Sequence, residues 1–176
     1  MRVLFLPTGW TLILCFVVWV AINLTVSFIC VSLPDEWMDL NSFLFPTRKF
    51  EKDGQIYQDI FRIRHWKHLL PDGGSLWKKK GYKKKHLKNY SEENLIRFLV
   101  ESCRGELTHW LAIFSFWVFG FFLPLNSLWF MLLYALVANL PCIFAQRYNR
   151  PRVQKLLRKV QDAQVKNATV HKESVI

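Results

Sequence analysis

Charged side chains are missing from two long parts of this 176-residue chain. Residues 3–33 and 107–145 contain no Asp, Glu, Lys or Arg, although these types make up 21% of the whole. Acidic residues are also scarce, 13 against 24 Lys and Arg, which leaves a formal charge of +11. Uncharged stretches of this length exclude a soluble globular domain, a disordered chain and a free nucleic-acid binder. The sequence therefore predicts a small integral membrane protein whose charge lies outside the bilayer.

Several signatures of known chemistry are absent as well. The chain has no Gly-rich phosphate loop, no Ser nucleophile elbow and no His-x4-Asp pattern of glycerolipid acyltransferases. The four cysteines lie in or beside the apolar segments, and their spacing indicates neither a disulfide framework nor a zinc site. We expect no bound metal, and no nucleic-acid partner, because the positive charge follows the membrane boundaries instead of forming one basic domain.

The apolar segments predict three membrane-spanning helices, at about residues 11–33, 107–123 and 125–145. A single helix over residues 107–145 would be about 58 Å long, nearly twice the hydrocarbon core, and Pro124 offers a break. The first segment could instead be a signal peptide, but its apolar core is long and no small-x-small cleavage site follows. The predicted fold is one all-α membrane domain, residues 1–176, with additional interfacial helices.

Basic residues near the last span predict the orientation. Three spans place residues 34–106 and the basic tail at 146–176 on the same side of the membrane. Arg147, Arg150, Arg152 and Lys155 follow the last span closely, so the positive-inside rule makes that side cytoplasmic. We therefore expect a multi-pass protein of the cell membrane with a cytoplasmic C-terminus.

The predicted cytoplasmic segment contains two surface features. Residues 55–63 carry apolar side chains at helical spacing, which predicts a short amphipathic helix. Residues 78–88 contain seven lysines, each worth about 1 kcal/mol on anionic lipid head groups. An ordinary solvated loop explains the lysine run equally well. Ser91 begins a helix that we expect to continue into the second span.

The strongest candidate for catalysis is Glu106 with His109. The two side chains are three residues apart, so on a helix they face one another. A carboxylate beside an imidazole orients the ring for general-base catalysis, and ionisable residues at membrane depth are usually functional. The alternative is an ion pair at the helix end. His68, in an aromatic and basic segment, is a second candidate base.

Two further groups are candidates for substrate binding. Asn139 precedes Pro141 in the last span, and an amide inside a membrane needs polar partners, either in a cavity or on a neighbouring helix. The segment after that span is rich in arginine, which can clamp phosphate or carboxylate groups, although plain anchoring explains it equally. The candidate binding residues are Arg104, Asn139, Gln146, Arg147, Asn149, Arg150 and Arg152. Pro151 is expected to begin a surface helix, with irregular chain after Gln164.

These motifs together resemble one family. The resemblance covers nearly the whole chain from the first span to about Leu157, and is most specific over residues 146–152. It rests on Trp66-Lys67-His68, Leu70-Pro71-Asp72-Gly73-Gly74, Glu101-x-x-Arg104-x-Glu106-x-x-His109-Trp110, Tyr134-Ala135-x-x-Ala138-Asn139-x-Pro141 and Gln146-Arg147-Tyr148-Asn149-Arg150-Pro151-Arg152. The sequence is similar to the glycosyl-4,4'-diaponeurosporenoate acyltransferase family of Gram-positive bacteria.

The resemblance implies an acyltransferase of staphyloxanthin-type carotenoid biosynthesis. Such an enzyme esterifies a sugar hydroxyl of a glycosylated carotenoid acid, or of a related glycolipid, with a fatty acyl group. The expected donor is an acyl thioester, acyl-CoA or acyl carrier protein, used as a co-substrate with no further cofactor. The alternative function is a non-enzymatic scaffold that binds anionic lipid or a partner enzyme through residues 78–88 and the tail.

Overall fold

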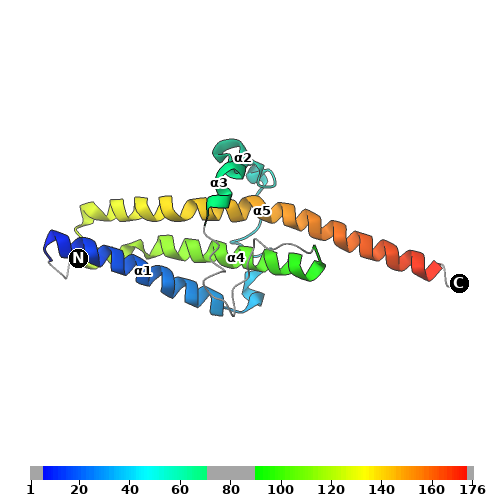
Figure 1. Ribbon diagram of the computed structural model, residues 1–176, viewed down its shortest axis with the longest axis horizontal. Helices are drawn as coiled ribbons and strands as arrows, with labels where there is room; N and C mark the ends of the chain where they lie inside the picture. The colour runs from blue at the N-terminus through cyan, green and yellow to red at the C-terminus, as the bar shows by residue number, and fades with distance from the viewer. Residues whose placement is uncertain (1–5, 71–89, 174–176) are drawn as a thin grey trace. The chain divides into compact units, whose positions relative to one another are not determined.

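The computed structural model describes residues 6–70 and 90–173, and within these ranges all regular structure is helical. This confirms the predicted all-α class (Figure 1). The lysine-rich segment at 78–88 and Asp72 lie outside the described residues. The helices are α1 (Thr8–Ser32), η1 (Asp35–Met38), η2 (Lys49–Glu51), α2 (Gln55–Phe61), α3 (Ile63–Trp66), η3 (Lys67–Leu69), α4 (Glu92–Phe114), η6 (Ser115–Phe121) and α5 (Leu125–Glu173).

The chain divides into two compact units, each with its own packing. The apolar unit contains α1, α4 from Arg104 onward, η6, and α5 as far as Phe144. The polar unit contains η1, η2, α2, α3, η3, the first part of α4, and α5 from Ala145.

The apolar unit is held together by aromatic side chains from three of its helices. Trp19 of α1 lies 5.0 Å from the Phe119 ring and 5.2 Å from the Tyr134 ring, between centroids. Other large apolar side chains point outward, and Phe16 and Trp129 are 70% and 72% exposed. Two helical segments, Thr8–Ser32 and Leu125–Asn167, are long and apolar enough to cross a membrane.

The predicted second span takes a different form. Helix α4 begins at Glu92, close to the predicted start, but ends at Phe114 and continues as the tighter η6 helix. Seven residues with four aromatic rings and Gly120 form this segment, and bulky side chains of this kind favour α-helix only weakly. The chain then turns at Pro124, as predicted, before α5 begins at Leu125.

Helix α5 is longer than expected, because it passes through Pro141 and Pro151 without a break. The predictions that a separate helix begins at Pro151 and that the chain becomes irregular after Gln164 were both wrong. A proline offers no N–H to the carbonyl four residues earlier, which costs one hydrogen bond but does not oblige the helix to stop. After Gln164 the described chain contains neither glycine nor proline, so nothing in its composition ends the helix before Glu173.

A left-handed turn joins η2 to α2 in the polar unit. Lys52, Asp53 and Gly54 have positive φ angles of 46°, 55° and 79°. A Cβ atom on Gly54 would lie 2.9 Å from the Arg147 carbonyl oxygen of α5. That carbonyl is the one to which Pro151 cannot donate. The backbone of this turn therefore packs on α5 so closely that only glycine fits.

We expect Gly54→Ala to lower the stability of the protein by about 2–4 kcal/mol, since it combines left-handed strain with a backbone clash. Thermal unfolding in detergent, followed by circular dichroism, measures the loss. Gly9→Ala is the matched control, because a Cβ atom there meets nothing within 4 Å. Equal melting temperatures for the two variants would contradict the close packing of this turn.

Candidate functional site

The ring of His109 lies against the amide of Asn139 in the apolar unit. His109 Nδ1 and Asn139 Oδ1 are 2.8 Å apart. Asn139 Nδ2 donates to the Ala135 carbonyl at 2.9 Å, which fixes the orientation of the amide. Because an amide oxygen only accepts, Nδ1 of the neutral ring carries the proton and Nε2 keeps its lone pair. The half-buried imidazole is thus held in a tautomer that suits a general base.

Asn139 is only 6% exposed, and the sequence predicts polar partners for its amide either in a cavity or on a neighbouring helix. Its hydrogen-bond partner is a side chain thirty positions away on another helix. Local helical spacing cannot reveal such a contact.

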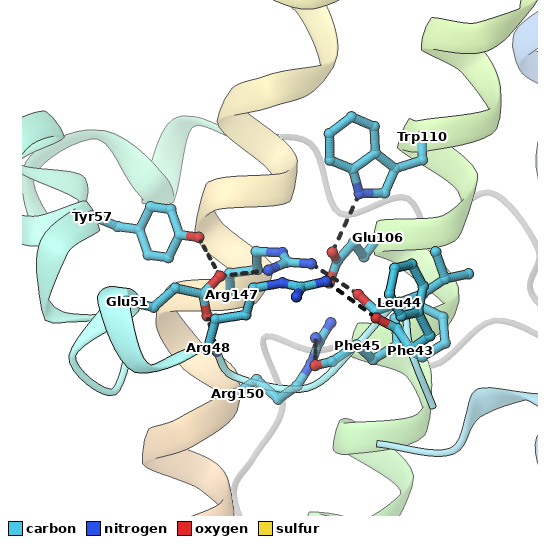
Figure 2. Close-up of polar contacts among 10 residues, drawn as sticks. All are labelled: Phe43, Leu44, Phe45, Arg48, Glu51, Tyr57, Glu106, Trp110, Arg147 and Arg150. Carbon is cyan, nitrogen blue, oxygen red and sulfur yellow. Dashed lines mark hydrogen bonds and ion pairs between the residues drawn. The ribbon is translucent and has the colours of Figure 1, made fainter. Parts of the chain in front are cut away.

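Glu106, the predicted partner of His109, is fully buried on α4. Its carboxylate accepts a hydrogen bond from Trp110 Nε1 at 3.3 Å (Figure 2). The pairing of Glu106 with His109 stays a prediction. An amide partner stabilises a protonated imidazole less than a carboxylate does. The contact with Asn139 therefore mainly fixes the orientation of the ring.

Arg104 holds the end of α1. Its Nη1 atom donates to the carbonyls of Cys30 and Leu33, each at 2.8 Å, and the residue is 5% exposed. The last carbonyls of a helix lack intrahelical donors and carry partial negative charge, so a guanidinium is a well-matched partner. These hydrogen bonds to α1 do not support the predicted role of Arg104 in binding the acyl donor, and that role stays a prediction.

We expect Arg104→Met to destabilise the protein by about 2–4 kcal/mol, because two carbonyls lose a charged donor. Arg158→Met removes the same charge from an exposed position of α5 and is expected to change stability little. Melting temperatures of both variants in detergent test this. Normal stability of Arg104→Met, with a raised KM for the acyl donor, would return Arg104 to the substrate site.

In the polar unit, two segments that the sequence singled out separately come together. Arg64 Nε donates to the Tyr148 hydroxyl at 2.6 Å, and Lys67 Nζ donates to Asn149 Oδ1 at 3.1 Å. The guanidinium of Arg152 stacks 3.6 Å from the centroid of the Tyr148 ring. His68 belongs to the same region but is exposed on η3.

A buried carboxylate organises the polar unit. Glu51, 1% exposed, accepts from Arg147 Nη1 at 2.5 Å and from the Tyr57 hydroxyl at 2.9 Å (Figure 2). Its second oxygen accepts from the backbone N–H of Arg48 at 3.2 Å. Arg147 also donates to the Leu44 carbonyl at 2.9 Å. This cluster joins η2, α2 and α5.

Burial, together with the Glu51 carboxylate, raises the pKa of Tyr57 far above its usual value. The phenol therefore keeps its proton at all physiological pH values and donates a hydrogen bond to the Glu51 carboxylate. Sequence reasoning missed Glu51. The one feature that could have indicated it is an acidic residue between the basic residues Lys49 and Lys52.

Arg150 and Gln146 also lie on this part of α5. Arg150, 2% exposed, donates to the carbonyls of Phe45 at 2.9 Å and Ser102 at 3.2 Å. Gln146 is half-buried. Arg147 and Arg150 are among the arginines predicted to clamp phosphate. Their described hydrogen bonds are made to Glu51 and to backbone carbonyls.

Metal ligation finds no support in the part of the chain that the structure describes. Residues 6–70 and 90–173 contain no cluster of three His, Cys, Asp or Glu side chains that could hold an ion. All four cysteines are free thiols, and three of them are buried.

Comparisons with known proteins identify the family. Residues 41–159 match the family model described as glycosyl-4,4'-diaponeurosporenoate acyltransferase. Proteins of that name from the Staphylococcus aureus strains bovine RF122 / ET3-1, USA300 and NCTC 8325 / PS 47 are each 32% identical over 148 residues. Each alignment covers 84% of this chain and 88% of the relative. No solved structure matches the chain significantly. The chain therefore belongs to the glycosyl-4,4'-diaponeurosporenoate acyltransferase family, a family of acyltransferases.

Proposed function

We propose that this protein transfers a fatty acyl group from a thioester donor to a sugar hydroxyl of a glycosylated carotenoid acid. Family membership supports the reaction class and the glycosylated carotenoid. The observation that carries the chemistry is the His109–Asn139 contact, which in the neutral imidazole places the proton on Nδ1 and the lone pair on Nε2.

In the proposed reaction, His109 Nε2 takes the proton of the sugar hydroxyl as its oxygen attacks the thioester carbonyl carbon. The new C–O bond forms, the C–S bond breaks, and the leaving thiolate recovers a proton from the imidazolium. Asn139 keeps the ring in position through both proton transfers. His68 is the reserve base, and it has the disadvantage of an exposed side chain.

The proposed site of action is the cell membrane. Large apolar side chains are exposed on α1 and on the first part of α5, and hydrocarbon is the environment that accommodates them at least cost. We propose a multi-pass topology in which the basic end of α5 lies on the cytoplasmic side, where acyl thioesters are made. Anionic lipids are expected to contact this basic surface.

The first test is mass spectrometry of extracted lipid and pigment. A strain lacking the gene is expected to lose an acylated glycoside and to accumulate its unacylated precursor, and the wild-type gene should reverse both changes. Purified protein in nanodiscs, supplied with that precursor and either acyl-CoA or acyl carrier protein, then identifies the donor. An unchanged lipid profile in cells that express the gene would refute the proposed activity.

A further inference from the structure

We propose that a cavity between the left-handed turn and α5 binds a phosphate group. The cavity has a volume of 230 Å³ and belongs entirely to the polar unit. Its walls come from the turn at residues 52–55 and from the part of α5 that begins at Pro151. The lining residues are Lys52, Asp53, Gln55, Pro151, Arg152 and Lys155.

The charge of the lining favours an anion. Three of the six lining side chains are cationic and one is anionic. Asp53 accepts from Lys155 Nζ at 2.7 Å, and this hydrogen bond lowers the pKa of Asp53, so the carboxylate stays ionised and holds the ammonium at the cavity. One carboxylate is too few for a divalent cation, which prefers several oxygen ligands. A polar cavity of this size also does not suit a carotenoid chain.

Arg152 is positioned to receive a tetrahedral anion. One of its terminal nitrogens donates to the Tyr148 carbonyl. The other donates to Gln55 Oε1 at 3.0 Å. Its guanidinium carbon lies over the Tyr148 ring, and this contact together with the two hydrogen bonds holds the side chain in place before a ligand binds. Arginine presents five N–H donors, of which these two bonds use two.

The backbone of the turn brings its side chains to the cavity. Lys52 and Asp53 are held in left-handed conformations, which cost L-residues about 1–2 kcal/mol each. Lys52 ends η2, where its N–H donates to the Lys49 carbonyl, and its own carbonyl accepts from the N–H of Gln55. The turn therefore places Lys52, Asp53 and Gln55 in one wall of the cavity, opposite the α5 wall that contains Arg152.

Two sources can supply the phosphate: a soluble acyl donor such as a coenzyme A thioester, or the head group of an anionic lipid. The assignment to a donor rests on the proposed function, whereas phosphate binding itself does not. Both sources share the chemistry that Arg152 and Lys155 recognise, and they differ in whether the ligand is soluble in water.

The test measures binding without turnover, using the full chain in maltoside detergent. Coenzyme A and inorganic pyrophosphate are titrated by calorimetry, and bound phosphatidylglycerol is counted by native mass spectrometry against uncharged diacylglycerol. Arg152→Gln and Lys155→Gln are each expected to weaken phosphate binding about five- to tenfold. Lys166→Gln removes an exposed charge from α5 away from the cavity and should leave binding unchanged.

The outcomes separate the alternatives. Weakened binding of coenzyme A in the two cavity variants supports a soluble donor, and weakened binding of phosphatidylglycerol alone supports a lipid head group. Lys155 is exposed, so Lys155→Gln keeps the test valid if Arg152→Gln fails to fold. If both cavity variants behave like Lys166→Gln in every titration, the phosphate site is refuted. A protein that binds phosphate through this cavity yet acylates no glycoside would refute only the proposed function.

Discussion

A His109→Ala variant is expected to fold normally and to lose acyl-transfer activity by about 10²- to 10⁴-fold. With Nδ1 facing Asn139 Oδ1, the neutral imidazole carries its lone pair on Nε2, and alanine has no atom that can take the hydroxyl proton. Because the loss concerns proton transfer, kcat should fall while KM for the glycoside changes little. Initial rates of purified protein in nanodiscs, with an acyl thioester and the unacylated glycoside, measure both constants.

His65→Ala is the matched control, since it removes an exposed imidazole from α3. It should retain wild-type kcat, and circular dichroism should show both variants folded. Full activity of His109→Ala would remove this residue from the mechanism. Loss of activity in His68→Ala instead would transfer the role of base to the exposed histidine.

Local patterns predicted the elements of this fold well. The helix from Glu92, the turn at Pro124 and the amphipathic segment near residues 55–63 all follow from capping, proline and helical spacing. The continuity of α5 was missed, because whether a helix survives a proline depends on what packs against it. At Pro151 that neighbour is the turn at Gly54, which lies about a hundred residues away in sequence.

The candidate site shows a sharper limit of sequence reasoning. Spacing along one helix predicts the pairing of His109 with Glu106, which stays a prediction, but it does not predict the contact of the ring with Asn139 from α5. Helical periodicity compares residues three or four positions apart, so it cannot weigh a partner on another helix. Both residues were recognised as candidates, but the contact between them depends on tertiary packing.

The arginines illustrate the same limit through charge. A basic segment beside a membrane span predicts phosphate binding or anchoring, because both use exposed cations. Arg104 and Arg150 are buried, and their described hydrogen bonds satisfy backbone carbonyls at the end of α1 and at Phe45 and Ser102. Sequence alone does not separate a buried guanidinium from an exposed one. Arg152, which lines a cavity, fits the original prediction better.

Glu51→Gln should destabilise the protein by about 3–5 kcal/mol, the second large effect that we expect. The substitution keeps the shape of the side chain but removes the charge that faces Arg147, whose own side chain is only 13% exposed. It also replaces one of the oxygens that accept from Tyr57 and from the Arg48 backbone with an NH2 group. Thermal unfolding in detergent, followed by circular dichroism, measures the loss.

Asp53→Asn is the matched control for this loss. It also replaces a carboxylate by an amide, two residues after Glu51. The affected ion pair, between Asp53 and Lys155, has side chains that are both more than 60% exposed. Solvent screens such a pair, so the melting temperature should change little. Similar melting temperatures for Glu51→Gln and Asp53→Asn would show that burial does not strengthen the contact of Glu51 with Arg147.

A double variant, Glu51→Leu with Arg147→Met, separates the charge from the packing. Buried ion pairs are often replaceable by apolar side chains of similar volume, whereas removing one partner leaves a charge in a site that excludes water. The double variant should therefore be more stable than either single change, with a coupling energy of about 1–3 kcal/mol. Recovery will be incomplete, because Tyr57 and the Leu44 carbonyl still lose their partners. Additive losses would mean that Glu51 and Arg147 stabilise the polar unit independently, and that their contact is not what joins η2 to α5.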